Sequence, residues 1–238
     1  MIGVVVPVHD EEACLGACLD ALRAAATCPR LRGEAVCIVI VLDACRDQSQ
    51  RIVLAHAMQA DLRWRLDCIA IEAHNVGAAR AAGARLLLQR GARWLAFTDA
   101  DTRVSPTWLS TQLALDADAV CGTVAVEDWS PHGSRAGALR AHFAQTYTDA
   151  DGHRHVHGAN FGVRASAYLR AGGFAPLACS EDVAMVAALQ ATGAHIAWSA
   201  APRVVTSARR QARARGGFGD TLLQVVAALD AAPHLTLT

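Results

Sequence analysis

Two carboxylates, Asp99 and Asp101, follow an apolar run and are separated by a single residue. The run from Arg93 to Thr98 is typical of a buried strand, and in an open α/β sheet ligands gather at the carboxyl ends of the strands. Carboxylate oxygens suit a hard divalent cation, which in turn could hold a diphosphate. The alternative is a solvated turn before a helix that opens at Ser105 and Pro106, because Asp-x-Asp is common by chance.

Acidic residues also follow two other apolar runs. Residues 2–7 lead into His9, Asp10, Glu11 and Glu12, and residues 36–42 lead into Asp43 and Asp47. If both runs are parallel strands, these acids share one sheet edge with the Asp-x-Asp pair, where they could hydrogen-bond a base and a ribose. Singly, each acid could equally cap a helix. There is no Gly-x-Gly-x-x-Gly after the first run and no P-loop motif, so neither a dinucleotide fold nor a P-loop enzyme is indicated.

The elements that must position these acids alternate between strand and helix patterns. We predict strands at 2–7, 36–42, 67–72, 93–99, 119–127, 157–163 and 195–199, and helices at 12–26, 47–59, 77–90, 106–115, 136–147, 180–192 and 218–229. Such alternation predicts an α/β fold with a mostly parallel, Rossmann-like sheet flanked by helices. The length of 238 residues and the lack of repeats or linkers favour a single domain, 1–238.

Composition argues against several classes of protein. The formal net charge is zero, so bulk electrostatics gives no reason to expect nucleic acid as a partner. No apolar run reaches the roughly 18 residues of a transmembrane span, which leaves only peripheral membrane contact. The eight cysteines include no Cys-x-x-Cys pair, a pattern typical of buried thiols in a reducing compartment. We therefore expect a cytoplasmic globular protein.

Six short segments, in order along nearly the whole chain, resemble motifs of the family 2 glycosyltransferases. Residues 5–12 resemble the family's V-P-x-Y/H-N-E-E opening, with Asp10 where Asn is commoner, and residues 41–47 resemble its V-x-D-x-S/C-x-D segment. The other four segments are 75–80, the D-x-D at 98–101, 158–161 with 172–174 (G-x-N and G-G-F), and the E-D at 180–182. The resemblance implies a GT-A fold, with a nucleotide-sugar-binding half (1–101) and an acceptor and catalytic-base half (102–238).

The resemblance implies a role for each matched residue. The expected substrate and nucleotide contacts are Pro7, His9, Glu11, Asp43, Arg80, Asp99, Asn160, Glu181, Arg209 and Arg213. Asp43 would accept a hydrogen bond from a base N–H, and Arg80 would reach the phosphates or hold neighbouring acids, although it could equally be a surface helix residue. Asp99 and Asp101 would hold Mg²⁺ or Mn²⁺, which neutralises charge on the departing nucleoside diphosphate.

Asp182 is the implied catalytic base. It would deprotonate an acceptor hydroxyl that attacks the anomeric carbon opposite the diphosphate, which inverts the configuration. The alternative is that residues 180–182 only start the following helix, because acids in a first turn stabilise it. We favour catalysis.

Two further patterns are chemically suggestive. Five arginines crowd residues 203–215, and guanidinium groups match phosphate oxygens, so this stretch could fold over a diphosphate as a lid. It could equally be a solvated helix face or a site for an anionic partner. His153, His155 and His157 alternate, so on a strand they would share one face; three imidazoles can bind zinc, although an exposed or hydrogen-bonded histidine run is the favoured interpretation.

Together these patterns predict a metal-dependent, inverting glycosyltransferase of the hexosyltransferase type. Its donor would be a nucleoside-diphosphate sugar, with UDP the expected carrier, and its acceptor a glycan, a lipid or a small molecule. A nucleotidyltransferase on a similar scaffold and a non-catalytic nucleotide-sugar or anion-binding module remain alternatives. A nucleotidyltransferase would require a Gly-rich triphosphate loop after the first strand, where this chain has Pro-Val-His-Asp-Glu-Glu.

Overall fold

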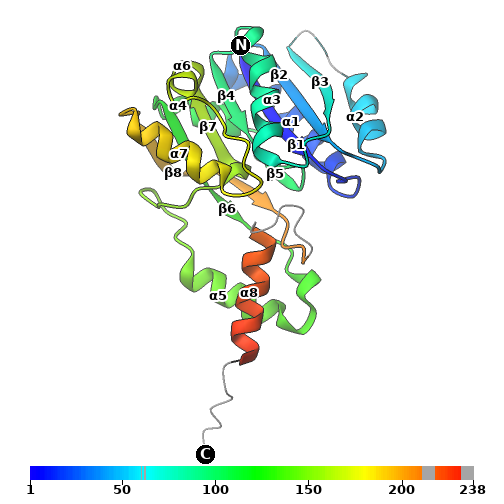
Figure 1. The fold of residues 1–238 in the computed structure, drawn as a ribbon, viewed down its shortest axis with the longest axis vertical. Coiled ribbons are helices and arrows are strands. Elements are labelled where there is room, and N and C mark those ends of the chain that lie inside the picture. The colour runs from blue at the N-terminus through cyan, green and yellow to red at the C-terminus, as the bar shows by residue number, and fades with distance from the viewer. Residues whose placement is uncertain (60, 62, 211–217, 232–238) are drawn as a thin grey trace, which may run out of the picture.

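The computed structural model describes residues 1–59, 61, 63–210 and 218–231. Eight strands of this part of the chain form one sheet in the order β3-β2-β1-β4-β7-β6-β8-β5 (Figure 1). They are β1 (Ile2–Val8), β2 (Val36–Asp43), β3 (Trp64–Ile71), β4 (Trp94–Phe97), β5 (Thr102–Val104), β6 (Ala119–Ala125), β7 (Phe161–Arg164) and β8 (Ile196–Thr206). Strands β3, β2, β1 and β4 are parallel, β7 is antiparallel to β4 and β6, and β8 is parallel to β6 and antiparallel to β5. The predicted mostly parallel α/β sheet is confirmed.

Helices cover both faces of the sheet. They are α1 (Leu15–Ala26), α2 (Ser49–Ala57), α3 (Val76–Gln89), α4 (Trp108–Ala114), α5 (Ala136–Thr146), α6 (Ala165–Arg170), α7 (Glu181–Ala191) and α8 (Phe218–Ala231), with short 3₁₀ turns η1 (Pro29–Leu31), η2 (Ser130–Arg135) and η3 (Gly158–Asn160). One buried cluster joins the sheet to α1, α2 and α4, and a second joins its other face to α3, α6 and α7. No helix of the described residues combines the length and apolarity that a membrane crossing needs.

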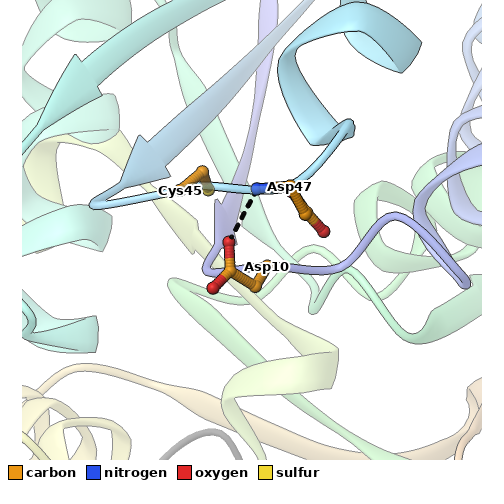
Figure 2. A group of neighbouring side chains, drawn as sticks. All are labelled: Asp10, Cys45 and Asp47. Carbon is orange, nitrogen blue, oxygen red and sulfur yellow. Dashed lines mark hydrogen bonds between the residues drawn. The ribbon is translucent and has the colours of Figure 1, made fainter.

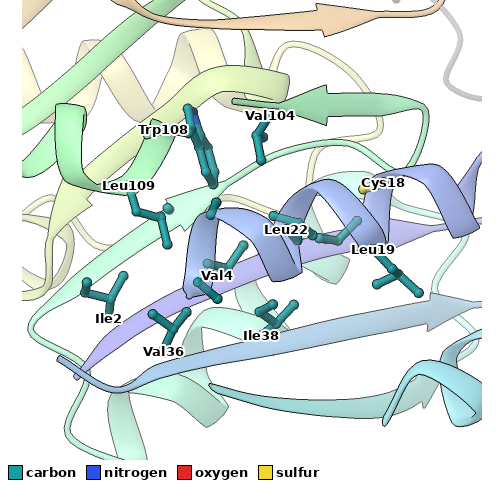
Figure 3. Packing of buried hydrophobic residues seen from close by; sticks show 14 of the residues in the cluster. Ile2, Val4, Cys18, Leu19, Leu22, Val36, Ile38, Val104, Trp108 and Leu109 are labelled. Carbon is teal, nitrogen blue, oxygen red and sulfur yellow. The ribbon is translucent and has the colours of Figure 1, made fainter. Parts of the chain in front are cut away.

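The central strands are apolar along their whole length because both of their faces are covered. In β1, Val4 packs in the cluster with α1, whereas its neighbour Val5 packs in the cluster with α3. Figure 3 shows the cluster with α1, in which Leu19 and Leu22 of this helix lie over β1 and β2. Continuous apolar runs are what such doubly covered parallel strands require.

Parallel pairing brings the acidic segments to one edge. In the register of β1, Val8 lies opposite Leu42 of β2, and Val5 lies opposite Phe97 of β4. The residues that follow these strands therefore emerge on the same side of the sheet. Gly83 lets α3 approach β1 closely, because a Cβ at this position would lie 2.5 Å from Val5 Cγ1. Arg80, about one turn earlier in α3, is thereby carried to the same edge.

Helices α5 and α8 form a separate small layer. In Figure 1 they lie together beyond β6 and β8, away from the other helices. Their apolar faces meet in a third cluster that includes Leu139 of α5, Leu222 of α8 and Trp129. This layer borders the cavity described below.

The structure differs from the prediction in several elements. The strand expected at 157–163 begins only at Phe161, because residues 158–160 form η3, in which the Asn160 side chain turns into the core. Strand β5 and helix α6 were not predicted, since each is too short for a periodic pattern, and β8 continues to Thr206 rather than ending at Ser199. Residues 153–157 form no strand, so the three histidines do not share a strand face.

Candidate functional site

A cavity of about 810 Å³ lies at the edge where the acidic segments emerge. Six acidic residues of the described chain line it: Glu11, Asp43, Asp99, Asp101, Glu181 and Asp182. Pro7, His9, Arg80 and Arg209 line it as well. The fold thus brings most of the expected site residues into one cavity, from segments as far apart in the chain as β1 and the end of β8.

Asp99 and Asp101 leave the carboxyl end of β4 and enter the short strand β5. The Thr102 backbone N–H donates to the Asp99 carbonyl at 3.1 Å, which closes the turn between the two strands. Pairing of β5 with the end of β8 brings Asp101 near Arg209. Burial raises the pKa of the Asp101 carboxyl from 3.8 to about 6; Arg209 lowers it, whereas Asp99 and Glu11 add to the increase. The positive charge of Arg209 therefore does not fully offset the cost of burying the Asp101 carboxylate.

Arg209 forms an ion pair with Asp101 and a closer one with Glu11. Its two terminal nitrogens donate to the Glu11 carboxylate at 2.5 and 2.7 Å, and one of them lies 3.2 Å from Asp101 Oδ2. The Ser49 hydroxyl accepts from the Glu11 backbone N–H at 3.0 Å and so fixes the loop after β1. Arg209 therefore binds two acids of the site in the absence of ligand.

Arg80 joins the Asp-x-Asp turn to α7. Its Nη2 donates to Asp99 Oδ1 at 2.6 Å and its Nη1 to the Gly158 carbonyl at 2.5 Å. Its Nε lies 3.1 Å from Glu181 Oε1, an ion-pair distance without hydrogen-bond alignment. Gly158 is required for this packing, because a Cβ there would lie 2.4 Å from the guanidinium nitrogens. Of the alternatives for Arg80, the structure shows the one in which it holds the neighbouring acids.

Asp182 lies in the first turn of α7 and faces the cavity. Its Oδ2 accepts from the Gly158 N–H at 2.7 Å, and its Oδ1 accepts from the Val183 N–H at 2.8 Å. Ser180 makes no side-chain capping bond and has a left-handed φ of 58°. Burial raises the pKa of the adjacent Glu181, which Arg80 partly offsets. The two acids are thus distinct, since Glu181 is buried against Arg80 whereas Asp182 is oriented by backbone amides.

The Asp43 carboxylate accepts hydrogen bonds from three consecutive backbone amides. It accepts from the backbone N–H groups of Ala73, His74 and Asn75 at 2.7, 2.9 and 2.8 Å. Asn75 in turn caps α3 through its side chain. The His9 ring nitrogen Nδ1 lies 2.7 Å from the Asp43 carbonyl oxygen. Asp43 therefore shapes this end of the cavity, and the base N–H expected from the sequence would have to share its carboxylate with three amides.

Asn160 does not line the cavity, which differs from the expected substrate contact. It is fully buried, its Oδ1 accepts from Trp108 Nε1 at 2.9 Å, and its Nδ2 donates to the Thr123 and Pro202 carbonyls at 2.8 and 2.6 Å. Every strong hydrogen-bonding position of its amide is thus directed at α4, β6 and β8, so its role in this structure is to hold those elements together. Arg213 lies outside the described residues.

The histidine run forms a stack of rings rather than a metal site. The ring centroids of His153 and His155 are 5.6 Å apart, and His155 stacks on Tyr147 at 4.1 Å. His157 Nε2 lies 2.9 Å from the Tyr147 hydroxyl. Burial and the neighbouring histidines lower the pKa of His157 to about 4, and burial lowers that of His155. No sequence motif marks Tyr147, although it contacts two of the three histidines.

A second group of possible metal ligands lies beside the cavity. Ligand atoms of Asp10, Cys45 and Asp47 lie within 4.8 Å of one another (Figure 2). These side chains already serve the two loops, because Asp10 Oδ1 accepts from the Arg46 and Asp47 backbone N–H groups at 2.7 and 3.2 Å. Asp47 Oδ2 accepts from the Glu12 N–H at 2.8 Å. The group therefore fits a structural role in joining the loops after β1 and β2.

The Asp99 and Asp101 pair fits a divalent cation better. Asp101 is buried and has a raised pKa, and the guanidinium of Arg209 already demonstrates that a positive group is accommodated beside it. Oxygen ligands of this kind match Mg²⁺ or Mn²⁺. Within the described chain, these two residues belong to no group of three potential ligands, so further ligands would come from water or from the phosphates.

The mixed α/β sheet, with the Asp-x-Asp turn and the Glu181 and Asp182 pair at one edge, has the GT-A fold of the solved structures described below. The family model "Glycosyl transferase family 2" matches residues 3–170. The chain belongs to family 2 of the glycosyltransferases. No curated protein sequence matches the chain.

Solved structures of glycosyltransferases share the fold at low sequence identity. The mannosyltransferase PcManGT of Pyrobaculum calidifontis, in complex with GDP-Man and Mn²⁺, has a TM-score of 0.63 and 18% identity over 90% of this chain. TarS of S. aureus has a TM-score of 0.60 and 14% identity over 87% of it. Glucosyl-3-phosphoglycerate synthase of Mycobacterium tuberculosis, in complex with phosphoglyceric acid, has a TM-score of 0.58 and 15% identity over 96%. The chain spans 58% of PcManGT, 60% of the TarS structure and 78% of the synthase.

Proposed function

We propose that this protein transfers a sugar from a UDP-linked donor to an acceptor hydroxyl, with a divalent cation and with inversion at the anomeric carbon. The observation that carries the proposal is that one cavity is lined both by the Asp99 and Asp101 pair and by Asp182. A cation-binding group for the leaving diphosphate and a base for the acceptor are the two functions that direct displacement needs.

On the donor side, the carboxyl ends of β1 and β2 would bind the nucleoside through Pro7, His9 and Asp43, which line the cavity. TarS has been solved with UDP, and PcManGT with GDP-Man and Mn²⁺. These complexes support a nucleotide-sugar donor. Whether its nucleobase is uracil or guanine is tested by the donor panel described below. Asp99 and Asp101 would hold Mg²⁺ or Mn²⁺. When bound, this cation supplies positive charge to the leaving diphosphate.

On the acceptor side, Asp182 would take the proton of the attacking hydroxyl. The amides of Gly158 and Val183 fix its carboxylate, so it is oriented before the acceptor arrives. Attack from the Asp182 side, opposite the diphosphate, inverts the configuration. Arg80 acts as a positioning residue, because it binds Asp99 on one side and approaches Glu181, the neighbour of Asp182, on the other.

Arg209 would contribute to phosphate binding once ligand enters. Its guanidinium reaches the cavity and is the described member of the arginine-rich stretch that pairs with the acids there. A bidentate fork of this kind suits phosphate oxygens. A cytoplasmic environment is in line with a sequence whose eight cysteines include no Cys-x-x-Cys pair.

The proposal is tested by the Asp182→Asn variant. A panel of UDP-sugars and GDP-sugars is first screened for thermal stabilisation with and without Mn²⁺, because a ligand that binds the native state raises its apparent stability. Asp182→Asn should keep donor binding and lose turnover by roughly 10²–10⁴-fold. Asp20→Asn, at an exposed acid of α1, is the control.

The outcome separates the proposal from its alternatives. Wild-type product with the configuration opposite to that of the donor, read from its anomeric proton by NMR, supports the displacement mechanism. Near-normal turnover by Asp182→Asn, or retention of configuration, refutes it. Donor binding without turnover by the wild type would favour a non-catalytic binding module, and release of pyrophosphate from a nucleoside triphosphate would favour a nucleotidyltransferase.

A further inference from the structure

The cavity continues from Asp182 to an apolar wall built by α5 and α8. Phe143 of α5, Tyr147 directly after that helix and Val225 of α8 line it and are half-buried. Leu139 and Leu222 line it as well and are buried. The wall is ordered by ring stacking, since the centroids of Phe143 and Tyr147 are 4.5 Å apart. The catalytic carboxylate therefore borders an apolar compartment rather than open solvent.

The segment 153–157 continues this wall through His155, Val156 and His157, whereas its Arg154 lies over the Trp198 ring, 5.2 Å from the ring centroid. The Tyr147 hydroxyl accepts from the Val124 N–H at 2.9 Å, so its own proton is free to be donated to His157 Nε2. Burial lowers the pKa values of His157 and His155, which disfavours the charged form of both rings. Both histidines line the cavity.

The charge of the described lining disfavours an anionic acceptor. It contains six acidic residues and two arginines, and both arginines are engaged by those acids, Arg80 with Asp99 and Arg209 with Glu11. A phosphate or carboxylate on the acceptor would meet carboxylates at one end and aliphatic, aromatic and imidazole side chains at the other. Burying such a charge without a partner is costly.

We propose that the acceptor is an uncharged alcohol whose apolar body lies against α5 and α8, with its hydroxyl beside Asp182. This inference rests on the proposed function and specifies its acceptor. In the transfer, the acceptor O–H proton goes to the Asp182 carboxylate and the oxygen forms a bond to the anomeric carbon. The bond between that carbon and the diphosphate oxygen breaks, and its electron pair leaves with the nucleoside diphosphate.

Two matched probes test the apolar wall. Octyl β-D-glucoside and methyl β-D-glucoside carry the same hydroxyl groups and differ only in the length of the alkyl chain. Their affinities are measured by calorimetry on protein saturated with UDP and Mn²⁺, and phosphoglyceric acid serves as the anionic probe. We expect the octyl compound to bind about tenfold or more tightly than the methyl compound, since burial of only two methylenes gives roughly that factor. Phosphoglyceric acid should bind more weakly than either.

Variants of α8 test whether the apolar wall is the source of this preference. Val225→Asp introduces a charge into the wall and should remove the preference for the octyl compound. Val225→Asn should reduce it similarly without a charge, which guards against loss of folding in the first variant. Gln224→Asp adds the same charge at the exposed neighbouring position and should leave the preference unchanged. Unchanged affinity for UDP with Mn²⁺ shows that each variant is folded.

Three results would each overturn the inference: equal affinity of wild type for the two glucosides, an equal loss in Gln224→Asp and Val225→Asp, or tighter binding of phosphoglyceric acid than of octyl glucoside. The proposed function is judged separately by cleavage of the donor with water as the acceptor. Cleavage that depends on Asp182, together with equal binding of the two glucosides, would uphold the function and refute only the acceptor class.

Discussion

Replacing Asp101 by Asn should make the ligand-free protein more stable while abolishing its response to metal. Asp101 is largely buried, with a side chain that is 12% exposed, and this burial raises its pKa from 3.8 to about 6. A carboxyl group with a higher pKa in the folded protein than in the unfolded chain binds its proton more tightly when folded. Its contribution to stability is therefore fully present below pH 3.8 and is lost as pH rises through about 6.

The size of the effect follows from the two pKa values. Each pKa unit corresponds to about 1.4 kcal/mol, so ionising Asp101 in the folded protein costs about 3 kcal/mol near neutral pH. This figure already includes the attraction of Arg209, which lowers the pKa. Because Asn does not ionise, Asp101→Asn should exceed wild type in free energy of unfolding by about 1–3 kcal/mol at about pH 8 and by little at about pH 4.

Urea unfolding across this pH range measures the difference directly. The matched control is Asp99→Asn, which removes the partner 2.6 Å from the buried Arg80 and should lower stability instead. In parallel, the increase in Tm caused by UDP with Mn²⁺ should disappear in Asp101→Asn. If Asp101→Asn is no more stable than wild type at about pH 8, or if its difference from wild type does not change with pH, the electrostatic account of this site is wrong.

Three other substitutions test how the site is supported. Arg80→Gln removes the guanidinium between Asp99, Glu181 and the Gly158 carbonyl, and should cost about 3–5 kcal/mol in urea unfolding, because the buried Glu181 carboxylate loses its partner. Asn160→Ala leaves two carbonyls and the Trp108 N–H unpaired, and should cost about 2–4 kcal/mol while UDP affinity measured on the folded protein stays the same. Arg209→Gln should bind Mn²⁺ more tightly than wild type without nucleotide, since the guanidinium no longer competes beside Asp101, yet bind UDP with Mn²⁺ more weakly by calorimetry. Arg210→Gln, at the exposed neighbouring position, should change neither affinity, and the opposite order of affinities for Arg209→Gln would contradict this role.

Much of the donor end could be predicted from the sequence because its geometry is local and repetitive. Apolar runs that are buried on both faces and alternate with helices form parallel strands, and parallel strands place their carboxyl ends at one edge. The acids at or just after the ends of β1, β2 and β4 therefore lie close together whatever the conformation of the loops. The Glu181 and Asp182 pair was identified by its resemblance to a family motif.

Only the tertiary structure decided which side chain meets which. Glu11 and Arg209 are 198 positions apart, and no periodic pattern relates residues at that separation. Asn160 and Arg80 both belong to motifs, yet folding buries the first among three elements and uses the second to bind acids. The apolar wall of α5 and α8 likewise depends on how two amphipathic helices pack beyond the sheet. Local sequence determines periodicity and hence the elements, whereas partners far apart in the chain are selected by the packing of the whole fold.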